Sequence, residues 1–274
     1  MLEQIQSYDL DSHIAEFYDQ HETERNDVAL LRRLIGAGER LRILEPFCGT
    51  GRLLLPLAQD GHELVGMDVA HFMLNRLRGK LEALPECVRK RVGLTEVDVL
   101  RTDWPSGFDL VILGGNCFYE LSSPEEQELC IARAARSLLP GGRLFLDNSH
   151  MEGLLDVSWR QMGKRKTLFP NGACAVGVKL EGFTELLWFD SERRLSRNRR
   201  SIRVTYPDGR VEERSYVQQK HPPSTSEMKD WLQRHGFTIE QLYGDKKGTR
   251  YTDASPRAVF WAHLADQERG QATK

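Results

Sequence analysis

The sequence lacks a long apolar run and lacks an excess of charge of either sign. A membrane-spanning helix needs about 20 consecutive apolar residues, and no stretch of this 274-residue chain approaches that length. The formal net charge is −2, which argues against a surface built throughout to neutralise nucleic-acid phosphates. The N-terminal residues also lack the charged and apolar regions of a secretory signal. We therefore expect a cytoplasmic globular protein with no membrane partner.

Cysteine is scarce, and its spacing follows no known framework. The five cysteines are an odd number, are spread widely, and include no CxxC pair and no cysteine–histidine spacing typical of zinc. We expect free thiols in a reducing compartment and no metal site. The residues concerned are Cys48, Cys87, Cys117, Cys130 and Cys174.

Short apolar runs alternate with longer amphipathic segments between residues 41 and 147. This alternation is typical of a parallel sheet covered by helices, and it predicts an α/β, doubly wound domain. Helices are expected from about residues 52, 71 and 124, the last with a capping pattern at Ser123, Pro124 and Glu126. The expected strands are 41–45, 63–67, 92–97, 108–113 and 142–147.

The pattern changes on both sides of this core. Residues 1–40 predict a helical cap, and 41–149 form the expected nucleotide-binding core. Residues 150–223 predict an antiparallel β insertion with turns at 170–172 and 207–209, which we expect to cover the acceptor site. Residues 224–274 predict a helix over 224–235 and two final strands, 238–243 and 258–262, that complete the core sheet.

Three polar features follow three successive predicted strands. Gly49 and Gly51 lie between the first strand and its helix, where glycines let a backbone approach a ligand. Asp68 follows the second strand, where a carboxylate can bind a ribose diol, and Asp98 follows the third. Each feature alone is most often a turn or a cap. Together, at the carboxyl ends of neighbouring strands, they predict a nucleotide site.

The spacing of the glycines narrows the choice of nucleotide. A dinucleotide fingerprint needs a third glycine three residues after the second, where this chain has Leu54. No Gly-Lys-Ser/Thr sequence follows the loop, so a P-loop is excluded. NAD and nucleoside triphosphates are therefore disfavoured.

At these residues the chain resembles the class I S-adenosylmethionine-dependent methyltransferases, in particular their small-molecule, N-methyltransferase-like branch. The resemblance implies a Rossmann-like seven-stranded sheet, with the antiparallel insertion between the fifth and sixth strands, and S-adenosylmethionine as cofactor. It rests on residues 44–51 (LEPFCGTG), 65–68 (VGMD), 97–99 (VDV), 108–113 (FDLVIL) and 138–146 (LLPGGRLFL).

The resemblance also implies a cofactor site, residue by residue. Many members of the family have a glycine where this chain has Phe47, so the loop contacts are expected to differ in detail. The methionine moiety is assigned to Glu45, Gly49 and Gly51, the ribose to Asp68 and its neighbour Val69, the adenine to Asp98 and Val99, the region of the methyl group to Gly115 and Asn116, and a closing aromatic ring to Tyr18.

Methyl transfer from a sulfonium is a direct displacement, for which the enzyme mainly supplies alignment and water exclusion. Three residues after the fourth and fifth strands are catalytic candidates: Asn116, Tyr119 and His150. Their alternative role is packing or a turn. The candidate acceptor-binding residues, which could equally belong to the core or end a strand, are Trp159, Trp188, His221 and Tyr251.

The expected function is transfer of a methyl group to a nitrogen, or less favourably an oxygen, of a small metabolite by a monomer or homodimer. RNA or tRNA methylation is the alternative, and it is suggested by six arginines between residues 193 and 203. No aromatic residue interleaves among them, and we expect Glu192, Glu212 and Glu213 to pair with them across a hairpin. A non-catalytic cofactor-binding protein on the same fold is the third possibility, and it predicts a blocked pocket.

Overall fold

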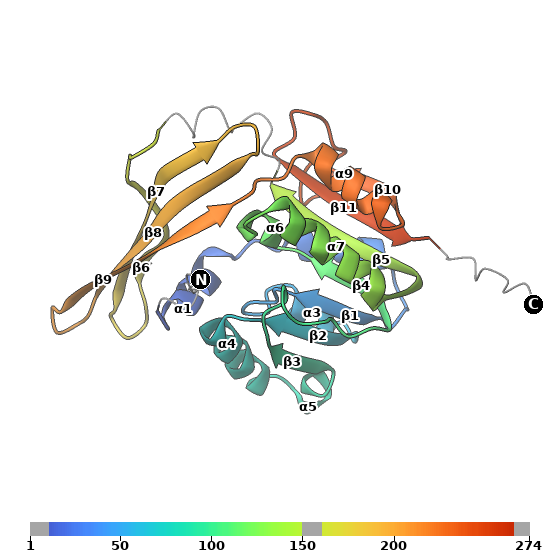
Figure 1. Ribbon diagram of the computed structural model, residues 1–274. Helices are drawn as coiled ribbons and strands as arrows, with labels where there is room; N and C mark the ends of the chain where they lie inside the picture. Colours follow the sequence, from blue (N-terminus) through green and yellow to red (C-terminus); the bar gives the residue numbers. More distant parts are fainter. Residues whose placement is uncertain (1–10, 150–160, 266–274) are drawn as a thin grey trace, which may run out of the picture.

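The chain folds around two separate sheets, one of seven strands and one of four. The computed structural model describes residues 11–149 and 161–265. Helices cover the larger sheet, and the smaller sheet stands beside it, above helix α1 in the view of Figure 1. Within the described residues, none of the helices combines the length and apolar character that a membrane crossing requires.

The seven-stranded sheet has the order β3-β2-β1-β4-β5-β11-β10. Its first five strands in this order are parallel, whereas β11 runs antiparallel to β5 and β10 antiparallel to β11. This arrangement confirms the predicted α/β, doubly wound fold. The strands are β1 (Arg42–Pro46), β2 (Glu63–Asp68), β3 (Val92–Glu96), β4 (Phe108–Leu113), β5 (Leu138–Ser149), β10 (Phe237–Tyr243) and β11 (Arg257–Leu264).

Alternation along the strands distributes the core over both faces of this sheet. On β4, Leu110 and Ile112 pack with helices α2 to α5, whereas Val111 and Leu113 pack with α7 and α9. Because helices bury both faces, β4 carries a continuous apolar run, Leu110–Leu113, rather than an alternating pattern. The helices are α1 (Ile14–His21), α2 (Asn26–Ile35), α3 (Leu54–Gln59), α4 (His71–Glu82), α5 (Glu86–Arg89), α6 (Cys117–Glu120), α7 (Pro124–Ser137) and α9 (Thr225–Arg234).

The ends of two helices follow directly from capping residues. The side chain of Ser123 accepts a hydrogen bond from the backbone N–H of Glu126 at the start of α7, as predicted. Ser224 and Glu227 form a reciprocal capping box at the start of α9, and Gly236, with φ of +81°, follows its end. These contacts satisfy N–H groups that the first helical turn leaves unpaired.

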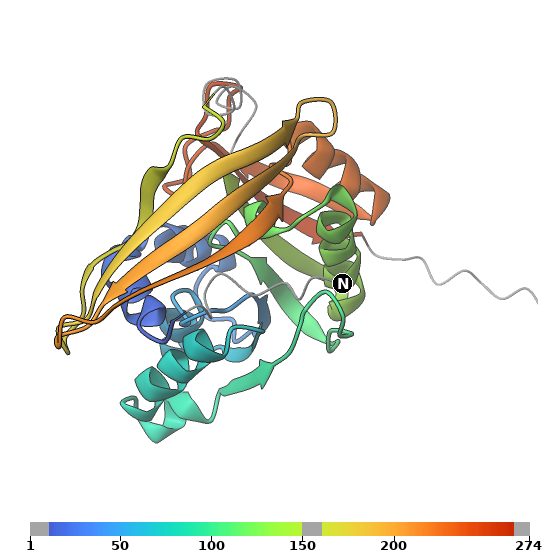
Figure 2. The same ribbon diagram turned by 60° about the vertical axis from the view of Figure 1, so that its left-hand side comes forward.

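The four-stranded antiparallel sheet is the predicted insertion between the fifth and sixth strands of the core. Its strands are β6 (Lys166–Ala173), β7 (Lys179–Asp190), β8 (Leu195–Thr205) and β9 (Val211–Lys220), paired in sequence order. Figure 2 shows these long strands crossing in front of α1 and the core. Leu180, Ile202 and Val204 of this sheet pack against Ile14 and Phe17 of α1, so α1 lies between the insertion and the core.

One of the two predicted hairpin turns is wrong. Residues 170–172 lie within β6, opposite β7, and a register shift between Leu168 and Asn171 accommodates them. A bulge tolerates a proline without an N–H and a glycine at positive φ, so these residues do not mark a turn here. The reversal lies farther along, where the N–H of Cys174 donates to the carbonyl of Val178 over 2.9 Å. The turn at 207–209 is confirmed.

Candidate active site

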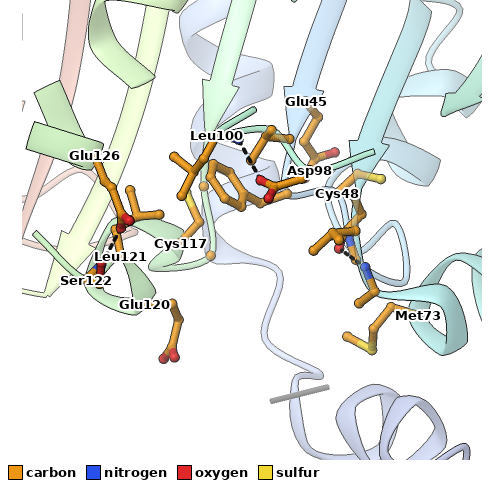
Figure 3. Close-up of a pocket in the computed structure, with 18 of the residues that line it drawn as sticks. Glu45, Cys48, Met73, Asp98, Leu100, Cys117, Glu120, Leu121, Ser122 and Glu126 are labelled. Atoms are coloured by element: carbon orange, nitrogen blue, oxygen red, sulfur yellow. Dashed lines mark hydrogen bonds between the residues drawn. The ribbon is translucent and has the colours of Figure 1, made fainter. Parts of the chain in front are cut away.

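A pocket opens at the carboxyl ends of β1, β2, β3 and β4, and residues of β9 close its other side. Figure 3 shows Glu45, Cys48 and Asp98 on one side and Cys117, Leu121 and Ser122 on the other. Within the described residues, this pocket contains most of the predicted cofactor residues: Tyr18, Glu45, Gly49, Asp68, Val69, Asp98, Val99 and Gly115.

Asp68 holds the glycine loop in place as well as lining the pocket. One of its carboxylate oxygens accepts a hydrogen bond from the N–H of Gly49 over 2.7 Å, and the other accepts one from the N–H of Ala70 over 2.8 Å. Gly51 lies behind the pocket wall, since a Cβ there would stand 2.4 Å from a methyl of Leu77. The second glycine of the loop is therefore required for packing against α4.

Phe47 takes the conformation that a glycine would take at its position. Its φ is +62°, in the left-handed region that non-glycine residues seldom adopt. The side chain lines the pocket and packs against the core on the α7 side of the sheet. The departure from the family pattern thus changes the surface of the pocket rather than the path of the loop.

Glu45 is buried at the base of the pocket, with 4% of its surface exposed. Burial raises the pKa of this carboxyl to about 8, although the nearby Arg52 guanidinium opposes the shift. Its Oε2 atom has no hydrogen-bond partner among the described residues. A buried carboxyl oxygen facing a pocket is suited to receive a cationic group such as an ammonium.

Asp98 and Val99 form the wall that follows β3. Asp98 accepts a hydrogen bond from the N–H of Leu100 over 2.9 Å, which fixes the turn. The carbonyl of Val99 accepts the indole N–H of Trp104 over 2.9 Å and also bonds to Arg133. The segment is therefore anchored from behind, and the apolar side chain of Val99 is left to face the pocket.

Tyr18 and Arg52 close the pocket near Gly115. A Cβ on Gly115 would stand 4.0 Å from the Tyr18 hydroxyl and 3.7 Å from a guanidinium nitrogen of Arg52. Arg52 forms two hydrogen bonds, of 2.9 and 2.6 Å, with the buried carboxylate of Asp27 in α2. Although burial opposes ionisation of both groups, this pairing lowers the pKa of Asp27 and raises that of Arg52. Arg52, which was not among the predicted site residues, thus connects the glycine loop to the helical cap.

Of the catalytic candidates, Asn116 and Tyr119 lie in the described part of the chain and do not line this pocket. Asn116 has φ of +64°, and its side-chain oxygen accepts the N–H of Ser149 over 2.7 Å, so it serves the junction of β4 and β5. The Lys220 ammonium lies 4.5 Å from the centre of the Tyr119 ring, and burial raises the pKa of Tyr119. His150 lies outside the described residues.

The three acceptor candidates that the structure describes, Trp188, His221 and Tyr251, also lie outside the pocket. His221 is 1% exposed, and its ring bonds to Gln127 over 2.7 Å, so it joins the insertion to α7. The Tyr251 hydroxyl donates to Thr225 over 3.2 Å at the start of α9. Trp188 is 39% exposed on the insertion, below the guanidinium of Arg197. Trp159 lies outside the described residues.

Sequence reasoning missed the polar groups at the end of the pocket away from Glu45. These are contributed by α6, by the segment after it, and by β9. The sequence held a signal for one of them, because Glu120 lies one helical turn after Cys117 and so shares its face. For β9 no comparable signal existed, since only the tertiary fold brings that strand to the core. The residues are Glu120, Ser122, Glu126, Tyr216, Gln218 and Gln219.

Three arginines of the arginine-rich segment, Arg194, Arg199 and Arg203, form ion pairs with carboxylates. Arg199 pairs with Glu185 over 2.8 Å, and Arg203 pairs with Glu213 over 3.3 Å. The predicted pairing of Glu213 is confirmed. The other predicted partners differ, since Glu212 bonds to Arg210 and Arg214.

The backbone N–H of Glu192 bonds to the Asp190 side chain at the turn between β7 and β8. Glu192 thus serves this turn, whereas the carboxylates that pair with Arg194, Arg199 and Arg203 are those of Glu227, Glu185 and Glu213.

All five cysteines are free thiols, as predicted. Cys48 and Cys117 line the pocket, but burial raises the pKa of both thiols well above the usual value. Because the thiolate is the reactive form, neither side chain is a nucleophile in this pocket.

Comparison with known proteins agrees with this geometry. Residues 43–142 match the family model described as a methyltransferase domain. The chain is 31% identical over 105 residues to the cypemycin N-terminal methyltransferase of a Streptomyces species, and the match spans 38% of this chain and 40% of that protein.

Solved structures match over nearly the whole chain. The CcbJ methyltransferase from Streptomyces caelestis superposes with a TM-score of 0.72 at 20% identity, covering 94% of this chain and 98% of that one. The sugar N-methyltransferase KedS8 from Streptoalloteichus sp superposes with a TM-score of 0.68 at 19% identity, covering 92% of each chain.

The sheet order, the pocket and these matches define a class I S-adenosylmethionine-dependent methyltransferase fold. Residues 43–142 of this chain are a methyltransferase domain of this family. The family and the cofactor predicted from the sequence, S-adenosylmethionine, are confirmed.

Proposed function

We propose that the chain transfers a methyl group from S-adenosylmethionine to a nitrogen of a small metabolite. The observation that carries this proposal is one pocket with two chemically different ends. The core strands line one end with Glu45, Asp68 and Asp98, and α6 and β9 line the other with Glu120 and Gln218. A cofactor and an acceptor can therefore meet inside a single cavity.

The cofactor end fits S-adenosylmethionine in its pattern of hydrogen-bond donors and acceptors. The unpartnered Oε2 of Glu45 is placed to receive the ammonium of the methionine moiety. Asp68 has lone pairs beyond those that bind Gly49 and Ala70, so it can also accept from the ribose hydroxyls. Val99 offers an apolar surface to the adenine, and the Tyr18 ring closes over the region near Gly115.

When bound, S-adenosylmethionine supplies a methyl group on a sulfonium sulfur for displacement by the lone pair of the acceptor nitrogen. The residues of this chain align the two reactants and exclude water, which are the main contributions that such a displacement needs. The Tyr119 hydroxyl and both pocket thiols stay protonated because burial raises their pKa values. Glu45, whose pKa burial raises to about 8, lies at the end of the pocket that we assign to the methionine ammonium. The proton of the methylated amine therefore leaves to solvent.

Nitrogen and a small acceptor are favoured over the alternatives by three observations. The name of one matched protein describes N-terminal methylation of cypemycin, and that of another describes N-methylation of a sugar. The paired arginines of β8 count against an RNA-binding surface. The open pocket counts against a non-catalytic protein on the same fold.

A product screen tests this function. The purified chain would be incubated with S-adenosylmethionine labelled in its methyl group and with amines, amino acids, amino sugars, their hydroxyl counterparts and bulk RNA. We expect label in an amine-containing small molecule. Label only in RNA or only in hydroxyl compounds would contradict the proposal.

A further inference from the structure

Glu120 lies where an acceptor would meet the methyl group. It ends α6, the short helix that follows Gly114 and Gly115 at the end of β4. Cys117 and Glu120 both line the pocket and are three residues apart, so they lie on one face of the helix about one turn, ~5 Å, apart. In Figure 3 the Glu120 side chain lies on the Cys117 side of the pocket, across from Glu45.

The surroundings of Glu120 keep it ionised. Its Oε1 accepts from the Lys220 ammonium over 2.7 Å, and its Oε2 accepts from the side-chain amide of Gln218 over 2.9 Å. Burial opposes ionisation, but Lys220, Gln218 and the charge of Arg200 on β8 lower the pKa of Glu120. Lys220 is buried, with 5% of its side chain exposed, and Tyr119 stacks beneath it.

Gln218 offers a second acceptor atom beside this carboxylate. Its amide nitrogen faces Glu120, which turns its Oε1 atom the other way, and that oxygen is buried without a hydrogen-bond partner among the described residues. A buried, unpartnered acceptor that lines a pocket needs a donor from a ligand. Glu120 and Gln218 together therefore present acceptor atoms only.

We propose that the acceptor's nitrogen binds between Glu120 and Gln218, and that Lys220 is the positioning residue that holds Glu120. This inference rests on the proposed function and narrows its substrate class to amines. An amine or ammonium offers two or three N–H donors to such a set, whereas an alcohol offers one.

The same arrangement suits the movement of charge in the reaction. The nitrogen lone pair forms the new N–C bond, the C–S bond breaks, and its electron pair goes to sulfur. Positive charge thus moves from the sulfonium to the acceptor nitrogen, next to the Glu120 carboxylate. A fixed negative group at the point where positive charge develops stabilises the transition state. Glu120 takes no proton, since its pKa is held low.

Sinefungin tests this assignment without knowledge of the acceptor. It is an S-adenosylmethionine analogue in which an amine-bearing carbon replaces the methylated sulfur, so its amine points to the acceptor side. Calorimetry would compare sinefungin with S-adenosylhomocysteine. We expect the unaltered chain to bind sinefungin at least about tenfold more tightly than S-adenosylhomocysteine, which is the gain that one hydrogen bond to a charged group provides. E120Q should lose this preference and should bind S-adenosylhomocysteine within about twofold of the affinity of the unaltered chain.

Three variants make the result unambiguous. E120Q/K220M removes both charges and leaves no unpaired buried ammonium, and it should also lose the preference. K220M alone should keep the preference for sinefungin at pH 8. When the pH is lowered, K220M should lose the preference at a higher pH than the unaltered chain, because Lys220 no longer lowers the pKa of Glu120. E125Q changes an exposed carboxyl on α7 outside the pocket and should keep it.

The outcomes separate the two claims. Binding of S-adenosylhomocysteine with a sinefungin preference that survives in E120Q and in E120Q/K220M would overturn the role of Glu120 and leave the proposed function standing. Failure of the unaltered chain to bind either compound would instead overturn the proposed function.

Discussion

Ionisation of Glu45 is unfavourable in the folded chain. Its pKa is about 8 in the folded chain against a usual value of 4.5, because burial disfavours the carboxylate. The folded state therefore holds one more proton than the unfolded state between these values. It follows that this group contributes stability below pH 4.5 and that the contribution is lost as the pH rises through 8.

Glu45→Gln should remove this pH dependence. The free energy of unfolding of the unaltered chain is expected to fall between pH 5 and pH 8 more steeply than that of the variant, by at most about 1.4 kcal/mol per pH unit. Urea unfolding at several pH values measures the difference. Parallel curves for the two proteins would show that Glu45 is not buried as a neutral carboxyl.

Asp68 combines a structural and a proposed binding role. Asp68→Ala should weaken binding of S-adenosylhomocysteine by ~2–4 kcal/mol, because it removes two ribose hydrogen bonds to a charged group and also releases the N–H of Gly49. Calorimetry measures the change. Arg101→Ala is the matched control, since it removes an exposed partner of Asp98 outside the pocket. Unchanged affinity in Asp68→Ala would refute the ribose assignment.

At the scale of elements, α1 connects the insertion to the core. Its Phe17 is fully buried against the insertion, whereas its Asp19 accepts from the Thr50 hydroxyl of the glycine loop over 2.7 Å and pairs with Lys80 of α4. Tyr18 lies between these two residues and lines the pocket. The position of the tyrosine is thus set from both sides.

Phe17→Ala should loosen this connection. We expect a loss of about 3–5 kcal/mol in the free energy of unfolding, as for other buried phenylalanines, and weaker binding of S-adenosylhomocysteine because Tyr18 is held less firmly. Gln20→Ala, an exposed change on the same helix, should stay within about 0.5 kcal/mol. Equal stability of the two variants would mean that α1 does not carry the contact between the sheets.

Elements with strong local signals were predictable from the sequence. The strand β4 was found at its observed bounds, Phe108–Leu113, because five of its six residues are apolar and glycines flank it. Capping residues placed the starts of α7 and α9. The turn at Pro170 failed because proline and glycine also occur in bulges, and only the pairing of β6 with β7 distinguishes the two cases.

The site divides in the same way. Asp68 and Asp98 were placed in the pocket because they lie at the ends of successive predicted strands, so a local rule fixes their position. Glu45 was assigned through the resemblance to the family. His221 and Tyr251 lie outside the pocket because their partners, Gln127 and Thr225, are supplied by distant segments. The acceptor end depends on β9, and nothing in the sequence of that strand specifies which loop it meets.

At the scale of the whole molecule, the pocket is a joint product of two sheets. The parallel core supplies the end of the pocket that we assign to the cofactor. The edge strand β9 of the insertion lies beside the segment after α6. The two are joined where the N–H of His221, directly after β9, donates to the carbonyl of Leu121 over 3.1 Å. The donor site is thus a property of the core fold. The acceptor site is a property of how the insertion docks on it.

The central claim is that this pocket binds S-adenosylmethionine, and calorimetry with S-adenosylhomocysteine tests it most directly. The account predicts saturable binding of one molecule per chain, weakened in Asp68→Ala. Absence of binding to the correctly folded chain would contradict the claim. So would binding with the same affinity in the unaltered chain, in Asp68→Ala and in Glu45→Gln.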